Sequence, residues 1–196
     1  MQVKILEDHQ IEKIHLKTLE ILENTGVYVP HEEILSKFAG CGAIIDRTSK
    51  IVKIPSSLVM ELLSKAGKSF TIYGRDLSKT AEFGVAKRNY NSSAGQAFWI
   101  DNVGDHRRHT TLSDVREATR LGDALEQITI PGAMSDPLEI PLEWRCIQVA
   151  LEMIKNTDKP ITFWFNDRRS AKYLIDFLMA LRGDEKSAQK YPLFYP

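Results

Sequence analysis

Trp164 and Asn166 lie at the end of an apolar, strand-like run that begins at Ile161. Because side chains alternate along a strand, we expect Thr162, Trp164 and Asn166 to share the face opposite Ile161. The face of an indole ring binds a quaternary ammonium with about 0.5 to 2 kcal/mol, so Trp164 is a candidate cation-binding residue. Two alternatives stay open: the ring of Trp164 packs in the core, and Asn166 and Asp167 cap the helix that follows.

A second candidate segment follows the apolar run that begins at Ile128, and it contains Met134, Ser135 and Asp136. A carboxylate at this position could balance the charge of a bound cation. Asp136 also precedes Pro137, and an aspartate before a proline is an ordinary start of a turn. Met134 and Asp136 are therefore candidate substrate-binding residues with a purely structural alternative.

A third candidate segment is the run of small and polar residues 89–96, which includes Asn91 and Gln96. Counting back from Ile128 by the spacing between the two apolar runs reaches Gly95, which would make this segment the first strand of a repeat. Small side chains let a ligand or a neighbouring backbone approach closely, whereas the alternative is a tight loop or hairpin. If the segment is a strand, Asn91 and Gln96 lie at the same end of the sheet or barrel as the candidates above.

His106 and His109 flank two arginines and raise the question of a metal or phosphate site. In an extended segment, residues three apart point to opposite faces, so the two imidazoles would not share a metal ion. Cys41 and Cys146 are far apart and lack the Cys-x-x-Cys spacing of zinc sites. We therefore expect neither a metal site nor a disulfide.

The composition excludes several classes of partner. Basic and acidic side chains balance at 26 each, so the chain lacks the positive field that holds a protein on nucleic acid. No run approaches the roughly 20 apolar residues that cross a bilayer. Residues 1–10 contain no apolar segment behind a basic flank, so secretion is not indicated. We expect a cytoplasmic protein without nucleic-acid or membrane partners.

The spacing of apolar residues predicts the elements of the first part of the chain. In residues 8–25 they recur every three or four positions and Gly26 follows, as in an amphipathic helix with a glycine cap. Similar patterns predict helices over 31–39 and 56–66, a hairpin over 43–54 and a strand over 70–73.

The later part of the chain predicts helices that alternate with strands. Thr111 and Asp114 fit a capping box, in which each side chain binds a free backbone amide at the start of a helix. Two further helices are expected from apolar faces within 144–154 and 171–181.

The apolar runs that begin at Ile128 and Ile161 are 33 residues apart, and one more step of this length reaches Phe194. Strand, helix and strand at this spacing are typical of a βαβ unit in a parallel sheet or barrel. Such a sheet needs more units than these 196 residues provide. We therefore expect the N-terminal part of a larger α/β protein.

Five short motifs, taken in their order and spacing, resemble the trimethylamine methyltransferase family, whose members are corrinoid-dependent enzymes. The motifs are Glu23 to Val27, Phe70 to Asp76, Thr110 to Ile128, Asp136 to Pro141, and Thr157 to Pro160. The resemblance implies a (β/α)8 TIM barrel with an N-terminal extension. Residues 1–88 would form the helical and β-hairpin extension, and residues 89–196 the first βα units of an incomplete barrel. The site would then lie at the C-terminal ends of the strands.

The resemblance also implies the reaction. A tertiary or quaternary methylamine, such as trimethylamine or glycine betaine, would give a methyl group to the corrinoid (cobalamin) cofactor of a separate corrinoid protein. This chain would bind no cofactor directly, and the parent protein is expected to be a homo-oligomer. The pyrrolysine that one branch uses would lie beyond Pro196. The alternative is a non-catalytic remnant that binds a small cation or docks on a corrinoid protein.

Overall fold

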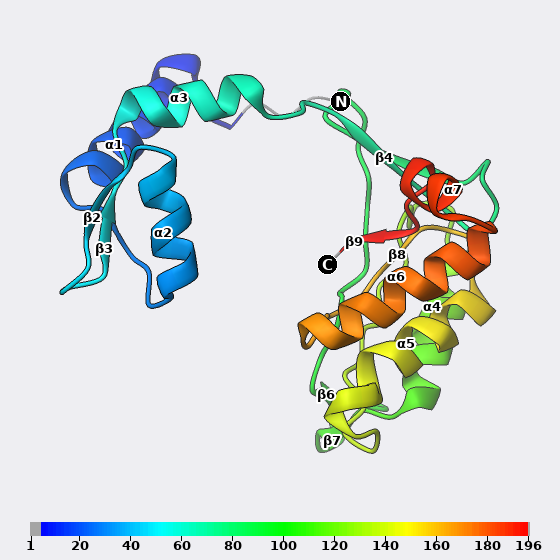
Figure 1. The fold of residues 1–196 in the computed structure, drawn as a ribbon. Coiled ribbons are helices and arrows are strands. Elements are labelled where there is room, and N and C mark those ends of the chain that lie inside the picture. The colour runs from blue at the N-terminus through cyan, green and yellow to red at the C-terminus, as the bar shows by residue number, and fades with distance from the viewer. Residues whose placement is uncertain (1–4, 196) are drawn as a thin grey trace. The chain divides into compact units, whose positions relative to one another are not determined.

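The computed structural model describes residues 5–195, and these form two compact units (Figure 1). The first unit ends at Gly67 and the second starts at Lys68. The hairpin within residues 70–83 packs in the second unit. The expectations on residues 1–4 and on Pro196 concern positions outside the described range. Within that range, no helix has the length and apolar character needed to cross a bilayer.

The first unit combines a small antiparallel sheet with three helices. Its elements are α1 (Asp8–Asn24), β1 (Val27–Tyr28), α2 (Glu32–Gly40), β2 (Ile44–Asp46), β3 (Ile51–Lys53) and α3 (Ser56–Lys65). Strand β3 lies between β1 and β2 and is antiparallel to both. The buried apolar residues of the first unit are Leu19, Leu35 and Val52. The predicted helices and hairpin are confirmed, and β1 is an additional strand.

Helix α1 ends as its sequence predicts. Gly26 adopts φ +81°, in the left-handed region that glycine favours, and its N–H donates to the carbonyl of Ile21 at 2.8 Å. The helix turns Leu19 toward the core, whereas Ile11, Ile14 and Ile21 are each more than half exposed. Much of its apolar stripe therefore lies on the surface of the unit.

The second unit contains the remaining elements. They are β4 (Phe70–Tyr73), β5 (Thr80–Phe83), β6 (Phe98–Trp99), β7 (Arg108–His109), α4 (Leu112–Ala124), α5 (Leu142–Asn156), β8 (Ile161–Thr162), α6 (Arg168–Arg182), α7 (Glu185–Lys190) and β9 (Phe194–Tyr195). The strand at β4 and the capping box that starts α4 are confirmed. Strand β8 is shorter than the apolar run that predicted it, and α7 was not predicted.

Neighbouring segments of the second unit run parallel to one another. The parallel pairs are Asn91 with Ile130, Gly132 with Thr162, and β8 with β9. Helices α4, α5 and α6 lie between consecutive segments in the chain and pack side by side (Figure 1). The expected strand–helix–strand repeat is therefore present. The first segment of the repeat pairs with the next through Asn91, slightly before the Gly95 that the spacing indicated.

Side chains alternate along the β8 segment as predicted. Ile161 and Phe163 are fully buried, in a core that they share with residues of α4, α5 and α6. On the opposite face, Ile72 of the β4–β5 hairpin packs with Ile130 and Tyr195. The hairpin thus covers the beginning of this face.

Arg182, from the end of α6, fastens the β4–β5 hairpin in place. Its guanidinium donates to the carbonyls of Tyr73 at 3.1 Å, Gly74 at 2.9 Å and Tyr191 at 3.0 Å. Burial lowers the pKa of Arg182. The N–H of Tyr73 also donates to the carbonyl of Pro192 at 2.7 Å. The hairpin is therefore bound to residues that lie about 100 positions later, which is a non-local contact.

Arg108 joins the β6–β7 hairpin to helix α4. Its guanidinium donates to both carboxylate oxygens of Asp101 and to both of Asp114, each at 2.8 Å. Asp114 also accepts from the backbone N–H of Thr111 at 2.8 Å. These donors, Arg108 foremost, lower the pKa of Asp114 to about 2, although burial acts in the opposite direction. The carboxylate therefore contributes to stability only while it is ionised.

We expect the second unit to lose about 2 kcal/mol of stability as the pH falls from about 5 to about 2 through this group. A carboxyl whose pKa is lowered by folding stabilises fully above its unfolded pKa, and the contribution is lost as pH falls through the folded pKa. Urea unfolding at a series of pH values measures the loss. An Asp114→Asn variant should show a smaller slope in this window, and an equal slope would contradict the assignment.

Candidate functional site

The three candidate segments of the sequence lie next to one another in the second unit. The N–H of Met134 donates to the carbonyl of Ser93 at 2.9 Å, and the N–H of Asp136 donates to the carbonyl of Gln96 at 2.8 Å. The bridge between Gly132 and Thr162 brings the segment that contains Trp164 and Asn166 alongside. We call residues 91–96, 132–136 and 162–166 the rim.

Gly132 allows the closest approach within the rim. Its N–H donates to the hydroxyl of Ser92 at 2.6 Å. A Cβ at this position would collide with the carbonyl oxygens of Ser92 and Ser93. Since backbone atoms cannot move aside without breaking the neighbouring bonds, only glycine fits here.

Trp164 presents its ring at the rim. It is 49% exposed, whereas Phe163 beside it is fully buried on the opposite face. A Cβ added to Gly95 would lie 3.1 to 3.3 Å from three atoms of the indole ring. The ring therefore lies against the Gly95 backbone, and about half of the surface of Trp164 is open within the described residues.

The carboxylate of Asp136 is paired with Arg145 from the first turn of α5. The guanidinium donates to Asp136 at 3.0 Å and to the carbonyl of Ile140 at 3.1 Å. The two side chains are only 22% and 11% exposed. Because Arg145 already balances the charge of Asp136, this carboxylate offers no unpaired negative charge to a cation at the rim. The ring of Trp164 is the group that a cation would contact there.

The three candidate amide side chains lie on the surface. Asn91, Gln96 and Asn166 are exposed, and Gln96 donates to a serine hydroxyl of its own loop at 3.0 Å. The helix-cap alternative holds for Asp167, whose carboxylate accepts from the N–H of Ser170 at 2.8 Å. Asn166 lies just before this cap, at the rim.

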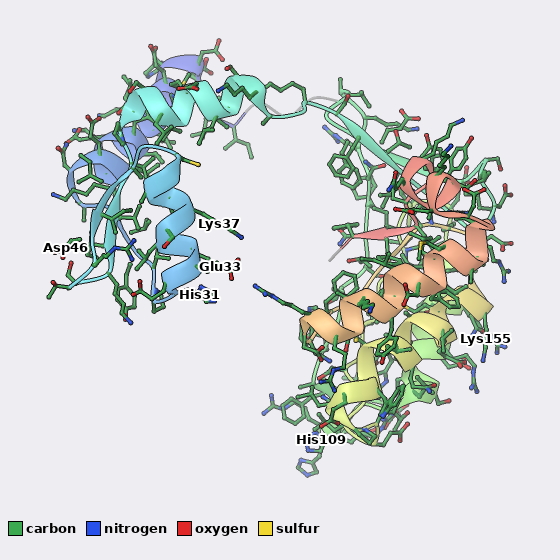
Figure 2. All side chains as sticks on the ribbon, in the orientation of Figure 1. His31, Glu33, Lys37, Asp46, His109 and Lys155 are labelled. Atoms are coloured by element: carbon green, nitrogen blue, oxygen red, sulfur yellow. The ribbon has the colours of Figure 1, made fainter. Side chains whose placement is uncertain are left out.

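The histidine pair belongs to a different part of the second unit. The ring of His109 stacks on Phe98 with centroids 5.1 Å apart, and Figure 2 shows His109 at the β6–β7 hairpin. Arg107 lies 5.0 Å from the centroid of the same Phe98 ring. Across residues 5–195, no three His, Cys, Asp or Glu side chains are arranged to hold a metal ion.

The first unit contains an apolar groove of about 530 Å³ among α1, α2 and α3. Leu22 and Phe38 contribute to its walls, and Cys41 and Lys37 also line it. The ammonium of Lys37 pairs with Glu33 at 2.9 Å on the same helix (Figure 2). A groove of this composition offers apolar contact rather than polar chemistry. The candidate site is therefore the rim in the second unit.

A model of the family described as trimethylamine methyltransferase (MTTB) matches residues 1–195. The chain belongs to the trimethylamine methyltransferase family. The resemblance carried by five short motifs is thereby confirmed over nearly the whole sequence.

Known members of the trimethylamine methyltransferase family align with almost all of this chain. The trimethylamine methyltransferase MttB of Desulfitobacterium hafniense (strain DSM 10664 / DCB-2) is 28% identical over 187 residues, covering 95% of this chain and 38% of that protein. The glycine betaine methyltransferase of Desulfitobacterium hafniense (strain Y51) is 27% identical, covering 96% and 39%. MttB of Methanosarcina thermophila is 26% identical, covering 99% and 41%. The chain spans about two fifths of the length of these relatives.

Sequence reasoning missed several features of the rim in this family member. Met134 adopts φ +52°, a left-handed conformation that costs a non-glycine residue about 1 kcal/mol or more. Ser135 is 2% exposed, and its hydroxyl has no hydrogen-bond partner within the described residues. Arg145 was also missed. A cation in the first turn of a helix opposes the macrodipole, and this was the available signal that Arg145 pairs with a carboxylate.

Proposed function

We propose that the protein to which this chain belongs transfers a methyl group from a tertiary or quaternary methylamine, such as trimethylamine or glycine betaine, to a separate corrinoid protein. We further propose a (β/α)8 barrel whose first βα units are residues 89–196, in a cytoplasmic homo-oligomer. Support comes from family membership, from the names of the relatives, and from parallel segments with α4, α5 and α6 side by side.

The half-exposed ring of Trp164 is the observation in this chain that most directly supports the proposal. It lies where three parallel segments end, which is the end at which barrel enzymes place their sites. A methylated ammonium offers a diffuse positive charge and methyl groups, and the face of an indole ring attracts both. Met134 and the amide groups of Asn91, Gln96 and Asn166 complete the proposed surface around the donor.

For a quaternary donor, the bond between the nitrogen and one methyl carbon breaks, and the nitrogen keeps the electron pair. The reduced corrinoid of the partner protein, as the acceptor, would supply the electron pair of the new bond to the methyl carbon. The donor thus loses its positive charge as it reacts. The amine product is neutral when the bond breaks, so Trp164 would hold it less tightly until it takes up a proton.

The reaction is tested by incubating the full-length protein with free reduced cobalamin and a panel of methylamines and betaines. We expect one class of donor to methylate the cobalamin, and a Trp164→Ala variant to lower kcat/KM by about 2- to 30-fold. Trp144→Ala is the matched control, because Trp144 is also exposed but lies on α5. A full-length protein that is inert toward every donor would contradict the proposed reaction.

A further inference from the structure

The segment that supports the ring of Trp164 is held at several points. The hydroxyl of Ser93 accepts from the side chain of Gln96 at 3.0 Å and donates to the carbonyl of Gly95 at 3.3 Å. The carbonyls of Ser93 and Gln96 also accept the N–H groups of Met134 and Asp136. Gly95 is therefore fixed from both sides and is itself buried.

Gly95 has no backbone need to be glycine. It is not among the described glycines with positive φ, so its backbone conformation is open to residues with a side chain. The nearest atoms to an added Cβ are three atoms of the Trp164 ring, at 3.1 to 3.3 Å. Such distances are tighter than ordinary contacts, so either the ring or the backbone must give way. Since the backbone is held on both sides, the ring would move.

We propose that Gly95 is a positioning residue that sets the pose of Trp164, so that one face of the ring rests on the backbone and the other is presented to a quaternary ammonium. The inference rests on the proposed function for the nature of the ligand. Glycine has no side chain that could contact a ligand, so Gly95 would act in binding only through the ring of Trp164.

The test is a double-mutant cycle of Gly95→Ala and Trp164→Ala in this chain, with tetramethylammonium chloride as the probe and sodium chloride as the salt control. Binding is followed by calorimetry. The pose of the ring is followed by fluorescence, and the Trp164→Ala variant separates its emission from that of the two other tryptophans. Gly67→Ala is the matched control, because an added Cβ there meets nothing within 4 Å and its φ is not positive.

We expect Gly95→Ala to change the emission of Trp164 and to weaken tetramethylammonium binding, by no more than the roughly 2- to 30-fold expected for Trp164→Ala. In the Trp164→Ala background it should weaken binding no further. Equal weakening in both backgrounds, or unchanged binding and emission, would overturn the proposal. A wild-type chain that does not bind tetramethylammonium would overturn the assigned ligand. Because neither readout uses methyl transfer, failure of the proposed reaction is distinguished from failure of this inference.

Discussion

Gly132→Ala is expected to destabilise the second unit by about 3 kcal/mol or more. The added Cβ would meet the carbonyl oxygens of Ser92 and Ser93, which are backbone atoms. To make room, the segment of Asn91 must separate from that of Ile130, which breaks the hydrogen bonds of Ser92 and Ser93 to the neighbouring segment. Urea unfolding gives the change in free energy.

Gly67→Ala provides the reference, because it adds the same methyl group in open space and should change stability by less than about 0.5 kcal/mol. If both variants unfold at the same urea concentration, the close approach at Gly132 does not exist in solution. Gly132→Ala should also weaken any ligand binding at the rim, since Met134 would lose its bond to Ser93.

Lys159→Met should cost about 3 kcal/mol, because Lys159 closes the end of α4. Its ammonium donates to the carbonyls of Gly122 at 3.0 Å, Leu125 at 2.9 Å and Ile128 at 2.9 Å. Burial lowers the pKa of this group, yet it keeps three acceptors. Methionine retains most of the stem but removes the ammonium from all three carbonyls, of which that of Leu125 keeps another donor, the N–H of Ile128 at 3.1 Å. A cation is also favoured at the C-terminus of a helix.

Lys155→Met is the matched variant for this experiment, because Lys155 is exposed on α5 (Figure 2). We expect it to change the free energy of unfolding by less than about 0.5 kcal/mol. Thermal or urea unfolding of the two variants in parallel isolates the role of the three carbonyls. A loss that is equal in both would show that charge, and not the closure of α4, determines the effect.

Local patterns in the sequence predicted most of the helices because their signals are themselves local. The capping box of Thr111 and Asp114 and the glycine after α1 each act within one helical turn. The alternation that buries Phe163 and exposes Trp164 was likewise predictable, since it needs only the period of a strand.

Contacts between distant segments were not predictable in the same way. The packing of Gly95 on Trp164 depends on how the parallel segments align. A shift of one residue in that alignment would remove this contact, and the spacing of the apolar runs did not predict the alignment to within one residue. The sequence therefore indicated which segments form the rim, but not which side chains are already engaged within it.

The fastening of the β4–β5 hairpin has a consequence for biosynthesis. The hairpin leaves the ribosome early, but Arg182 is bonded to Tyr73 across 109 positions, and Pro192 comes later still. Until those residues are translated, the apolar side chains of the hairpin lack their partners, and closing so long a loop is slow. We therefore expect the second unit to finish folding only after synthesis has passed Pro192, and the apolar side chains of the hairpin to stay without these later partners until then.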